Sequence, residues 1–221
     1  MKNILLAWSS GKDSAWAFHL LSQRPDIRIA ALVTTFNSAA QRVAMHAVRR
    51  WLVDAQAERL GVPLWPVDLP WPCSNEQYEE IMSKVYGQAV SEGIAAAAFG
   101  DLFLEDIRAY RERQLQGTGL ELLFPLWQMP TAQLALDMID AGIKAKITCV
   151  DPTKLDKTFA GRDFDRSLLA SLPEHVDHCG ENGEFHTFVY AGPMFRNRKQ
   201  ETTGEIVERD GFVFADVTEE L

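Results

Sequence analysis

The chain has 221 residues, of which 47% are hydrophobic and 24% are charged, and its formal net charge is −9. This composition is that of a globular protein large enough to bury a core, and no apolar run approaches the roughly 20 residues of a membrane-spanning helix. The acidic charge balance argues against a bulk nucleic-acid partner, because binding to a phosphate backbone depends on a basic surface.

The cysteines indicate a reducing compartment. Cys73, Cys149 and Cys179 form no C-x-x-C pair and are odd in number, whereas disulfide frameworks normally use an even number. The first residues lead directly into a predicted strand, with no small-residue cleavage site behind an apolar stretch. We therefore expect a cytoplasmic protein with no membrane partner, and the composition is compatible with a homo-oligomer.

The N-terminal stretch predicts a strand, a tight turn and a helix. An apolar run at residues 3–8 is followed by S-S-G-K-D-S at residues 9–14, and a helical pattern begins at Ala15. Such a turn directs backbone N–H groups and the positive end of a helix toward one point, which favours an anion such as phosphate. Gly11 would allow the backbone to approach a ligand closely. The alternative is an ordinary strand–helix turn in which Asp13 complements the helix dipole.

Strands and helices alternate through the first half of the chain. The pattern predicts strands at 27–36, 62–68 and 94–99, a helix at 41–60, and a helix that begins in an S-x-x-Q capping box at Ser74 and ends at Gly93. This alternation is typical of parallel β-α units, whose ligands bind beyond the carboxyl ends of the strands. Residues 9–14 and 100–101 follow predicted strands and residues 34–35 lie at the end of one, so we expect all three stretches at one edge of a sheet.

Gly100 and Asp101 end the predicted strand at 94–99 and precede an acidic helix that carries Arg111. Beside a phosphate-binding turn, Asp101 and Arg111 are candidates for contacts with substrate or phosphate. The alternative is a solvated helix whose charges pair four residues apart.

The second half of the chain predicts a smaller α+β unit. We place a domain boundary between residues 125 and 126, followed by a helix at 131–141 and a strand at 143–150. Asp210 and Gly211 lie between two β-prone runs, which is a strong hairpin signal.

A loop at residues 175–190 carries three histidines, a cysteine and several carboxylates. Glu181 and Glu184 are each preceded by a glycine, in the run G-E-N-G-E-F-H-T-F-V. The residues alone allow a turn before a strand, or a metal site, although no pair has a familiar zinc spacing.

Two of these motifs resemble a known family. S-x-G-x-D-S at residues 9–14 resembles the pyrophosphate-binding loop, usually S-G-G-x-D-S, of the ATP pyrophosphatases, with Ser10 where that family usually has glycine. G-E-N-G-E-F-H-T at residues 180–187 is similar to G-E-G-G-E-x-E-T of the diphthine–ammonia ligase family. Asn182 and His186 depart from the usual glycine and glutamate, which leaves the substrate open. The two motifs are about 170 residues apart in family order, so the resemblance covers essentially the whole chain.

The resemblance implies an α/β fold with a doubly wound, mostly parallel, Rossmann-like sheet at residues 1–125 and a closing α+β domain at 126–221. It implies an ATP-dependent ligase that adenylates a carboxylate, releases pyrophosphate with the help of Mg²⁺, and joins ammonia to the product. The carboxylate would belong to a small molecule or a protein. The expected catalytic residues are Asp101, Glu181 and Glu184. The expected nucleotide-binding residues are Ser9, Ser10, Gly11, Lys12, Asp13, Ser14, Thr34, Gly100 and Arg111. The alternatives are a nucleotide sensor without turnover and a tRNA-modifying enzyme.

Overall fold

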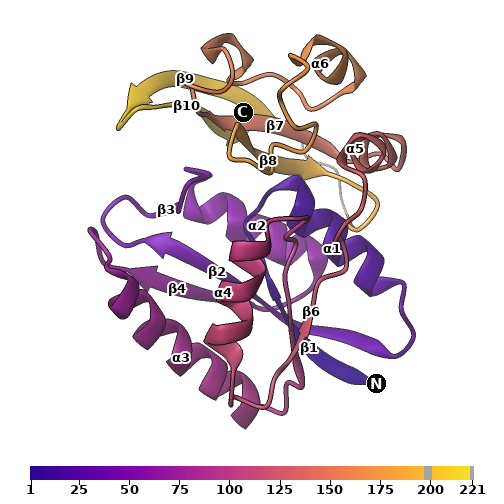
Figure 1. The fold of residues 1–221 in the computed structure, drawn as a ribbon, viewed down its shortest axis with the longest axis vertical. Helices are drawn as coiled ribbons and strands as arrows, with labels where there is room; N and C mark the ends of the chain where they lie inside the picture. Colours follow the sequence, from indigo (N-terminus) through magenta and orange to yellow (C-terminus); the bar gives the residue numbers. More distant parts are fainter. Residues whose placement is uncertain (197–200, 220–221) are drawn as a thin grey trace.

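The computed structural model describes residues 1–196 and 201–219, which form two β-sheets, one from each half of the sequence (Figure 1). The first sheet has six strands: β1 Lys2–Ala7, β2 Ile27–Asn37, β3 Arg42–Val43, β4 Leu64–Leu69, β5 Ala96–Ala98 and β6 Glu121–Leu123. The second sheet has four: β7 Lys144–Val150, β8 Phe185–Ala191, β9 Glu201–Arg209 and β10 Phe212–Glu219. The predicted α/β fold is confirmed.

The first sheet is parallel except for β3. Strand β1 pairs with β2 on one edge and β5 on the other, β4 extends the sheet beyond β2, and β6 extends it beyond β5. The chain therefore builds outward from β1 in one direction and then in the other. The crevice between the carboxyl ends of β1 and β5 is the topological switch point where α/β sheets bind ligands.

Helices cover both faces of this sheet. Helices α1 Lys12–Ser22 and α2 Arg50–Leu60 lie between the two sheets, whereas α3 Asn75–Ser91 and α4 Glu105–Leu115 cover the opposite face (Figure 1). Helix α3 begins in the predicted capping box, in which Ser74 accepts a hydrogen bond from the backbone N–H of Gln77. The apolar face of α3 packs with Leu5, Val33 and Ala97 in a core separate from the one under α1.

The second half folds against α1 and α2. Its strands lie in the order β8-β7-β10-β9, and the predicted hairpin at Asp210 and Gly211 joins β9 to β10. Two helices, α5 Thr131–Asp140 and α6 Arg166–Ser171, and the 3₁₀ helix η1 Lys157–Phe159 complete it. One hydrophobic core contains buried residues of both halves, among them Phe18, Leu52, Phe164 and Phe188. The predicted boundary between residues 125 and 126 lies between β6 and α5, but the two halves share this core.

The predicted helix at residues 41–60 is wrong over its first half. Residues Arg42–Val43 form β3, which pairs antiparallel with the end of β2, and α2 begins only at Arg50. Between them the chain turns with positive φ angles at Met45 and Ala47. Val48, which the helical pattern placed on the apolar face, is buried but reaches the core from a turn, and Val43 is buried in β3. Pairing with β2 thus overrides a local helical periodicity.

The sequence analysis also missed β6, a three-residue strand beside β5. No helix within the described part of the chain is long and apolar enough to cross a membrane.

Charged side chains join the two halves beside β3. Arg42 and Arg49 both contact the Asp216 carboxylate of β10, with Nη1–Oδ1 and Nη2–Oδ2 distances of 2.9 and 2.5 Å. Burial opposes ionisation of Asp216, but the hydrogen bonds from Arg49 and Arg42 outweigh it and lower the pKa of this carboxyl.

Asp216→Asn is therefore expected to lower the free energy of unfolding at pH 7 by about 1–2 kcal/mol, as for loss of charged hydrogen bonds at a partly exposed site. Because the folded pKa is depressed, this stability is present above the unfolded pKa of about 3.8 and is lost as the pH falls through the folded value. Urea unfolding at pH 7 and pH 3 measures the difference. Asp210→Asn at the exposed hairpin tip is the control; an equal loss in both variants would contradict the role of Asp216.

Candidate functional site

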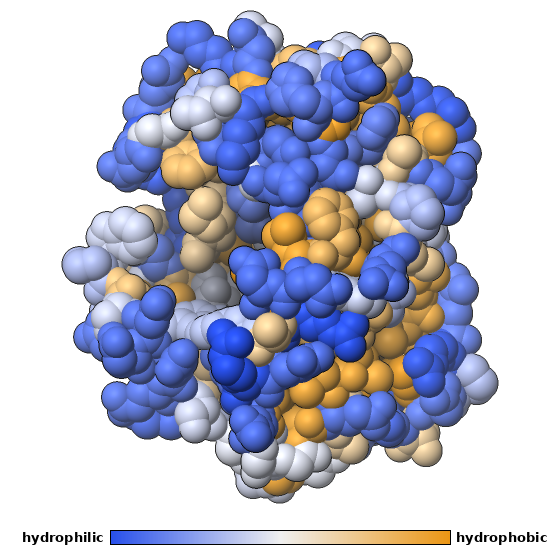
Figure 2. Space-filling model, in the orientation of Figure 1, coloured by the Kyte–Doolittle hydropathy of each residue, from blue (hydrophilic) through white to orange (hydrophobic). Residues whose placement is uncertain are grey.

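A cavity of about 480 Å³ opens at the switch point of the first sheet and extends to the second half of the chain. Figure 2 shows a hollow between the upper and lower halves of the molecule. The lining includes all three predicted stretches, through Ser9 and Ser14, Thr34 and Thr35, and Gly100 and Asp101. The second half contributes residues 179–181 and 185–187. Parallel topology thus brings the strand ends together as expected.

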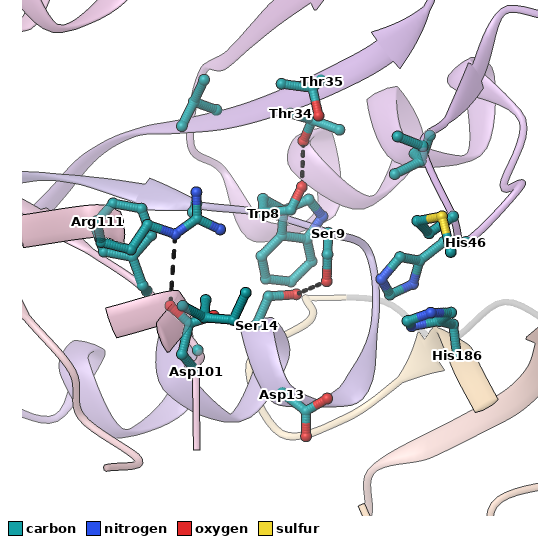
Figure 3. A pocket seen from close by; sticks show the side chains of 18 of the residues that line it. Trp8, Ser9, Asp13, Ser14, Thr34, Thr35, His46, Asp101, Arg111 and His186 are labelled. Atoms are coloured by element: carbon teal, nitrogen blue, oxygen red, sulfur yellow. Dashed lines mark hydrogen bonds and ion pairs between the residues drawn. The ribbon is translucent and has the colours of Figure 1, made fainter. Parts of the chain in front are cut away.

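The loop at residues 9–14 forms the middle of the cavity (Figure 3). The Ser9 and Ser14 hydroxyls are 3.2 Å apart, and Ser14 Oγ donates to the Gly11 carbonyl at 2.9 Å. Helix α1 begins within this loop, at Lys12, and its N-cap Gly11 offers no side chain to the N–H groups of the first turn. The positive end of α1 and two hydroxyls therefore face the same space, which suits a phosphate group.

Ser10 has a φ angle of 71°, in the left-handed region that disfavours a side chain. Its hydroxyl is buried and has no hydrogen-bond partner within the described residues. Its carbonyl accepts bonds from Val189 N at 2.9 Å and Gln56 Nε2 at 3.2 Å, which hold the turn in place. Tertiary contacts therefore stabilise a conformation that glycine would adopt more easily.

Ser10→Gly is expected to leave ATP affinity within about twofold and the free energy of unfolding within about 1 kcal/mol. Glycine relieves the left-handed strain of the folded loop, which raises the free energy of unfolding, but it also gives the unfolded chain more conformational freedom, which lowers it. The two contributions are similar in size and opposite in sign. Titration calorimetry and urea unfolding check both values, with Ser10→Ala as the variant that loses the hydroxyl but keeps the strain. A tenfold loss of affinity in both variants would show that the hydroxyl contacts the nucleotide.

The backbone comes unusually close to its neighbours at two glycines. A Cβ added to Gly11 would lie 2.9 Å from His46 Cε1 and 3.1 Å from the Thr187 carbonyl oxygen. A Cβ at Gly100 would lie 3.1–3.2 Å from the backbone of Asp13 and Ser14. Gly11 thus lets β8 pack against the loop, and Gly100 lets the end of β5 pack against α1.

Lys12, an expected nucleotide-binding residue, lines the cavity, but its ammonium already has partners in the protein. Its side chain is buried, and its ammonium donates to both oxygens of Asp13, at 2.9 and 3.0 Å, and to the Cys179 carbonyl. Burial opposes its charge, but Asp13 together with Cys179 and Glu181 outweighs this and raises the pKa of Lys12. The ammonium therefore ties the loop to the second half of the chain instead of projecting freely toward a phosphate.

Asp101 and Arg111 line one side of the cavity, as Figure 3 shows. Arg111 Nε lies 3.6 Å from Asp101 Oδ2, and neither atom has a hydrogen-bond partner among the residues that the structure describes. Burial raises the pKa of Asp101 despite the opposite guanidinium. Beyond this pair, the cavity reaches under α3 and α4 between apolar and aromatic side chains that include Tyr78, Met82, Tyr86 and Phe99. Two incompletely paired charges beside such walls can still bind polar groups of a ligand.

Thr34 also lines the cavity, at the end of β2, but its hydroxyl is buried and donates to the Trp8 carbonyl at 2.5 Å. Its side chain therefore joins β2 to β1.

Glu181 reaches the cavity from the second half of the chain. Its Oε1 accepts a hydrogen bond from Leu102 N at 2.8 Å, just beyond the end of β5. Burial raises the pKa of Glu181 to about 7, and the nearby carboxylates Asp13 and Asp101 add to the shift. A carboxyl group that titrates near neutral pH can accept a proton at physiological pH.

The prediction that Glu184 faces the cavity is wrong. Its side chain is buried, and Oε1 accepts from Asp177 N at 3.0 Å and Asn182 Nδ2 at 3.1 Å. The carboxylate satisfies donors of its own loop, because a short loop with buried N–H groups needs an acceptor inside it. Glu184 shapes the loop that carries Glu181.

Three residues of this region were not among the expected site residues. Gln56 is buried in α2 and links the indole of Trp8, the turn at Ser10 and the Val189 carbonyl of β8. His46 and His186 face each other at the cavity edge opposite Asp101 (Figure 3), with ring centroids 4.7 Å apart. The departure of His186 from the family signature was visible in the sequence, but its meeting with His46 depends on how the two halves pack.

Over the described ranges 1–196 and 201–219, no three His, Cys, Asp or Glu side chains are grouped closely enough to hold a metal ion by themselves. A magnesium ion that arrives with phosphate oxygens needs only one or two protein carboxylates. Asp101, with its unpartnered Oδ2 in the cavity, fits that requirement.

The chain is similar to known proteins over most of its length. The diphthamide synthase N-terminal domain matches residues 1–122, and the diphthamide synthase C-terminal domain matches residues 130–216. Diphthine–ammonia ligase of Bos taurus is 29% identical over 196 residues, and that of Homo sapiens is 27% identical over 196 residues. Each alignment covers 80% of this chain and 70% of the relative. A solved structure of a predicted tRNA methyltransferase subunit from Methanocaldococcus jannaschii is 15% identical, with a TM-score of 0.43, over 66% of this chain and 79% of that one. Because the two family domains together span nearly the whole sequence, the chain belongs to the diphthamide synthase family, as its two motifs predicted.

Proposed function

We propose that this protein is an ATP-dependent ligase that adenylates a substrate carboxylate, releases pyrophosphate and then joins ammonia to the activated carboxyl group. Family membership bears out the predicted class of enzyme, an amide-forming ligase. The observation that carries the finer proposal is the cavity itself, in which the start of α1 faces Glu181 from the other half of the chain. By analogy with its relatives, the substrate carboxylate is that of diphthine.

In the first step, a carboxylate oxygen attacks the α-phosphorus of ATP, and the bond to the β-phosphate breaks. The N–H groups at the start of α1 and the hydroxyls of Ser9 and Ser14 hold the phosphates, so that positioning and electrostatics supply most of the catalysis. Magnesium would offset the charge of the leaving pyrophosphate, with Asp101 as the carboxylate beside it. Arg111 faces the same space and would orient an anionic group of a substrate.

In the second step, ammonia attacks the acyl carbon, the bond to AMP breaks, and the attacking nitrogen loses a proton. Glu181 is the group that accepts this proton, because it lines the cavity and its pKa lies near 7. In this scheme residues 1–125 bind the nucleotide, and residues 126–221 close the cavity over the acceptor.

Product analysis tests the proposal. The protein is incubated with α-labelled ATP, ammonium and a set of carboxylates that includes diphthine-bearing protein. We expect AMP and pyrophosphate in equal amounts, dependent on the carboxylate. ADP and orthophosphate as the only products would overturn the assignment, and ATP binding without turnover for every carboxylate would favour a sensor. The net charge of −9 gives no support to the tRNA-modifying alternative.

A further inference from the structure

The side chains around the cavity carry too little positive charge for a polyphosphate. The charged side chains of its lining are two cations, Lys12 and Arg111, and three carboxylates, Asp13, Asp101 and Glu181. Each cation already faces a carboxylate, Lys12 with Asp13 and Arg111 with Asp101. Pyrophosphate would therefore meet side chains whose net charge is neutral or negative, and positive charge in addition to that of the start of α1 and of Mg²⁺ would favour its binding.

His46 and His186 are the remaining titratable side chains of the lining that can gain a positive charge. His46 follows β3, His186 belongs to β8, and their rings are tilted by 39° with centroids 4.7 Å apart. The His46 ring covers the phosphate-binding turn, since its Cε1 lies 2.9 Å from the position of a Cβ on Gly11. The pair therefore borders the start of α1, on the side away from Asp101 (Figure 3).

The partner of His46 Nδ1 indicates which ring nitrogen carries the proton of the neutral imidazole. Nδ1 lies 3.0 Å from the Thr187 carbonyl oxygen, which can only accept, so Nδ1 is the donor. A neutral His46 then presents the lone pair of Nε2. Among the described residues, none hydrogen-bonds to a ring nitrogen of His186. Two nitrogen sites of the pair are thus available to take up a proton or bind a ligand.

Both imidazoles are neutral while the cavity holds no anion. Burial lowers the pKa of His46, and burial together with His46, Lys12 and Lys154 lowers the pKa of His186 to about 3. The hydrogen bond to the Thr187 carbonyl and then the charge of Asp13 act in the opposite direction and favour protonated His46, whereas Lys12 disfavours it. A polyanion within a few ångströms would oppose this lowering, because an opposite charge at 4–6 Å raises the pKa of a cationic acid by about 1–3 units.

We propose that His46 and His186 form the subsite for the terminal phosphates, and that the pair takes up a proton when pyrophosphate binds there. The inference rests on the proposed function, because it assigns residues to the part of the same cavity that would bind the terminal phosphates of ATP. The proton shared by the two rings supplies the missing positive charge, and it leaves with the pyrophosphate. The family signature usually carries glutamate at the position of His186, so this chain replaces a carboxylate by a group that can become a cation.

The test is titration calorimetry with pyrophosphate, without Mg²⁺, in two buffers of different ionisation enthalpy at pH 7. The difference in apparent enthalpy gives the number of protons taken up, and we expect about one for the unmodified protein. The affinity for pyrophosphate should then rise by up to about tenfold for each pH unit between pH 8.5 and 6.5. This measurement needs no variant.

Two variants test whether His46 and His186 take up the proton when pyrophosphate binds. His46→Asn keeps a donor toward the Thr187 carbonyl, and His186→Asn removes the second ring. Each should abolish most of the proton uptake and weaken pyrophosphate binding at pH 6.5 about tenfold, while AMP binding changes less than about twofold. His178→Asn is the control, because His178 lies in the neighbouring loop and does not line the cavity.

Unchanged proton uptake in both variants, no uptake in the unmodified protein, or an equal loss of AMP binding would overturn the inference but not the proposed function. Failure of the unmodified protein to bind pyrophosphate with or without Mg²⁺ would overturn both. Thermal unfolding of each variant separates loss of binding from loss of the fold.

Discussion

Replacing Gly11 by valine is expected to abolish detectable ATP binding, a loss of at least about 100-fold in affinity. A Cβ at this position would come within 2.9 Å of His46 and 3.1 Å of the Thr187 carbonyl, so β8 and the His46 ring would be displaced from the loop. The two further methyl groups of valine would extend into space that phosphates need. The sequence suggested that valine would occupy space for the phosphates, and the structure adds the clash with His46 and Thr187.

Binding of ATP is measured by titration calorimetry, and circular dichroism reports the fold. Gly87→Ala is the matched control, because Gly87 lies inside α3 and a Cβ there meets nothing within 4 Å. Alanine also favours a helix over glycine by roughly 1 kcal/mol. A folded Gly11→Val protein that binds ATP normally would show that the phosphates lie elsewhere.

Replacing Glu181 by glutamine is expected to lower ligase turnover about 100-fold, while ATP affinity stays within a few-fold. Glutamine keeps the size of the side chain and an oxygen that can accept from Leu102 N, but it has no basic carboxylate. Since burial raises the pKa of Glu181 to about 7, the turnover of the unmodified enzyme should rise with pH and reach half its maximum near pH 7. The rise reflects loss of the proton from the carboxyl group, and it should be absent in the glutamine variant.

Glu184→Gln provides the comparison. Glu184 does not line the cavity and accepts hydrogen bonds from Asp177 N and Asn182 Nδ2, so its replacement should chiefly lower the free energy of unfolding, by about 1–3 kcal/mol. Any loss of turnover should leave the pH dependence unchanged. Rate–pH profiles and urea unfolding of both variants distinguish the two roles. An unchanged pH dependence in Glu181→Gln would contradict the assignment of Glu181 as the proton acceptor.

Local patterns predicted the parts of this fold that depend on neighbouring residues. Alternating strands and helices gave the parallel sheet, the box at Ser74 gave the start of α3, and Asp210 with Gly211 gave the last hairpin. The capping box and the hairpin turn depend on residues only a few positions apart, so the local sequence is enough to predict them. Topology then placed residues 9–14, 34–35 and 100–101 at one edge, where the cavity lies.

Backbone pairing and the partners of buried charged groups decided the rest. The helical periodicity after residue 41 gave way to pairing of Val43 with Phe36 of β2. Lys12 turned toward Cys179, and Glu184 toward its own loop, because a buried charge requires partners that only the folded chain supplies.

The contact between His46 and His186 likewise depends on the folded chain. His46 and His186 are 140 positions apart, and neither has a neighbour in the sequence that reveals the other. The sequence by itself determined the family, the parallel β-α architecture and the turn between β1 and α1. Packing of β8 against the turn at residues 9–14 determined which side chains line the cavity. The direction of a side chain depends on the helices and strands that pack around it, and these come together only in the folded chain.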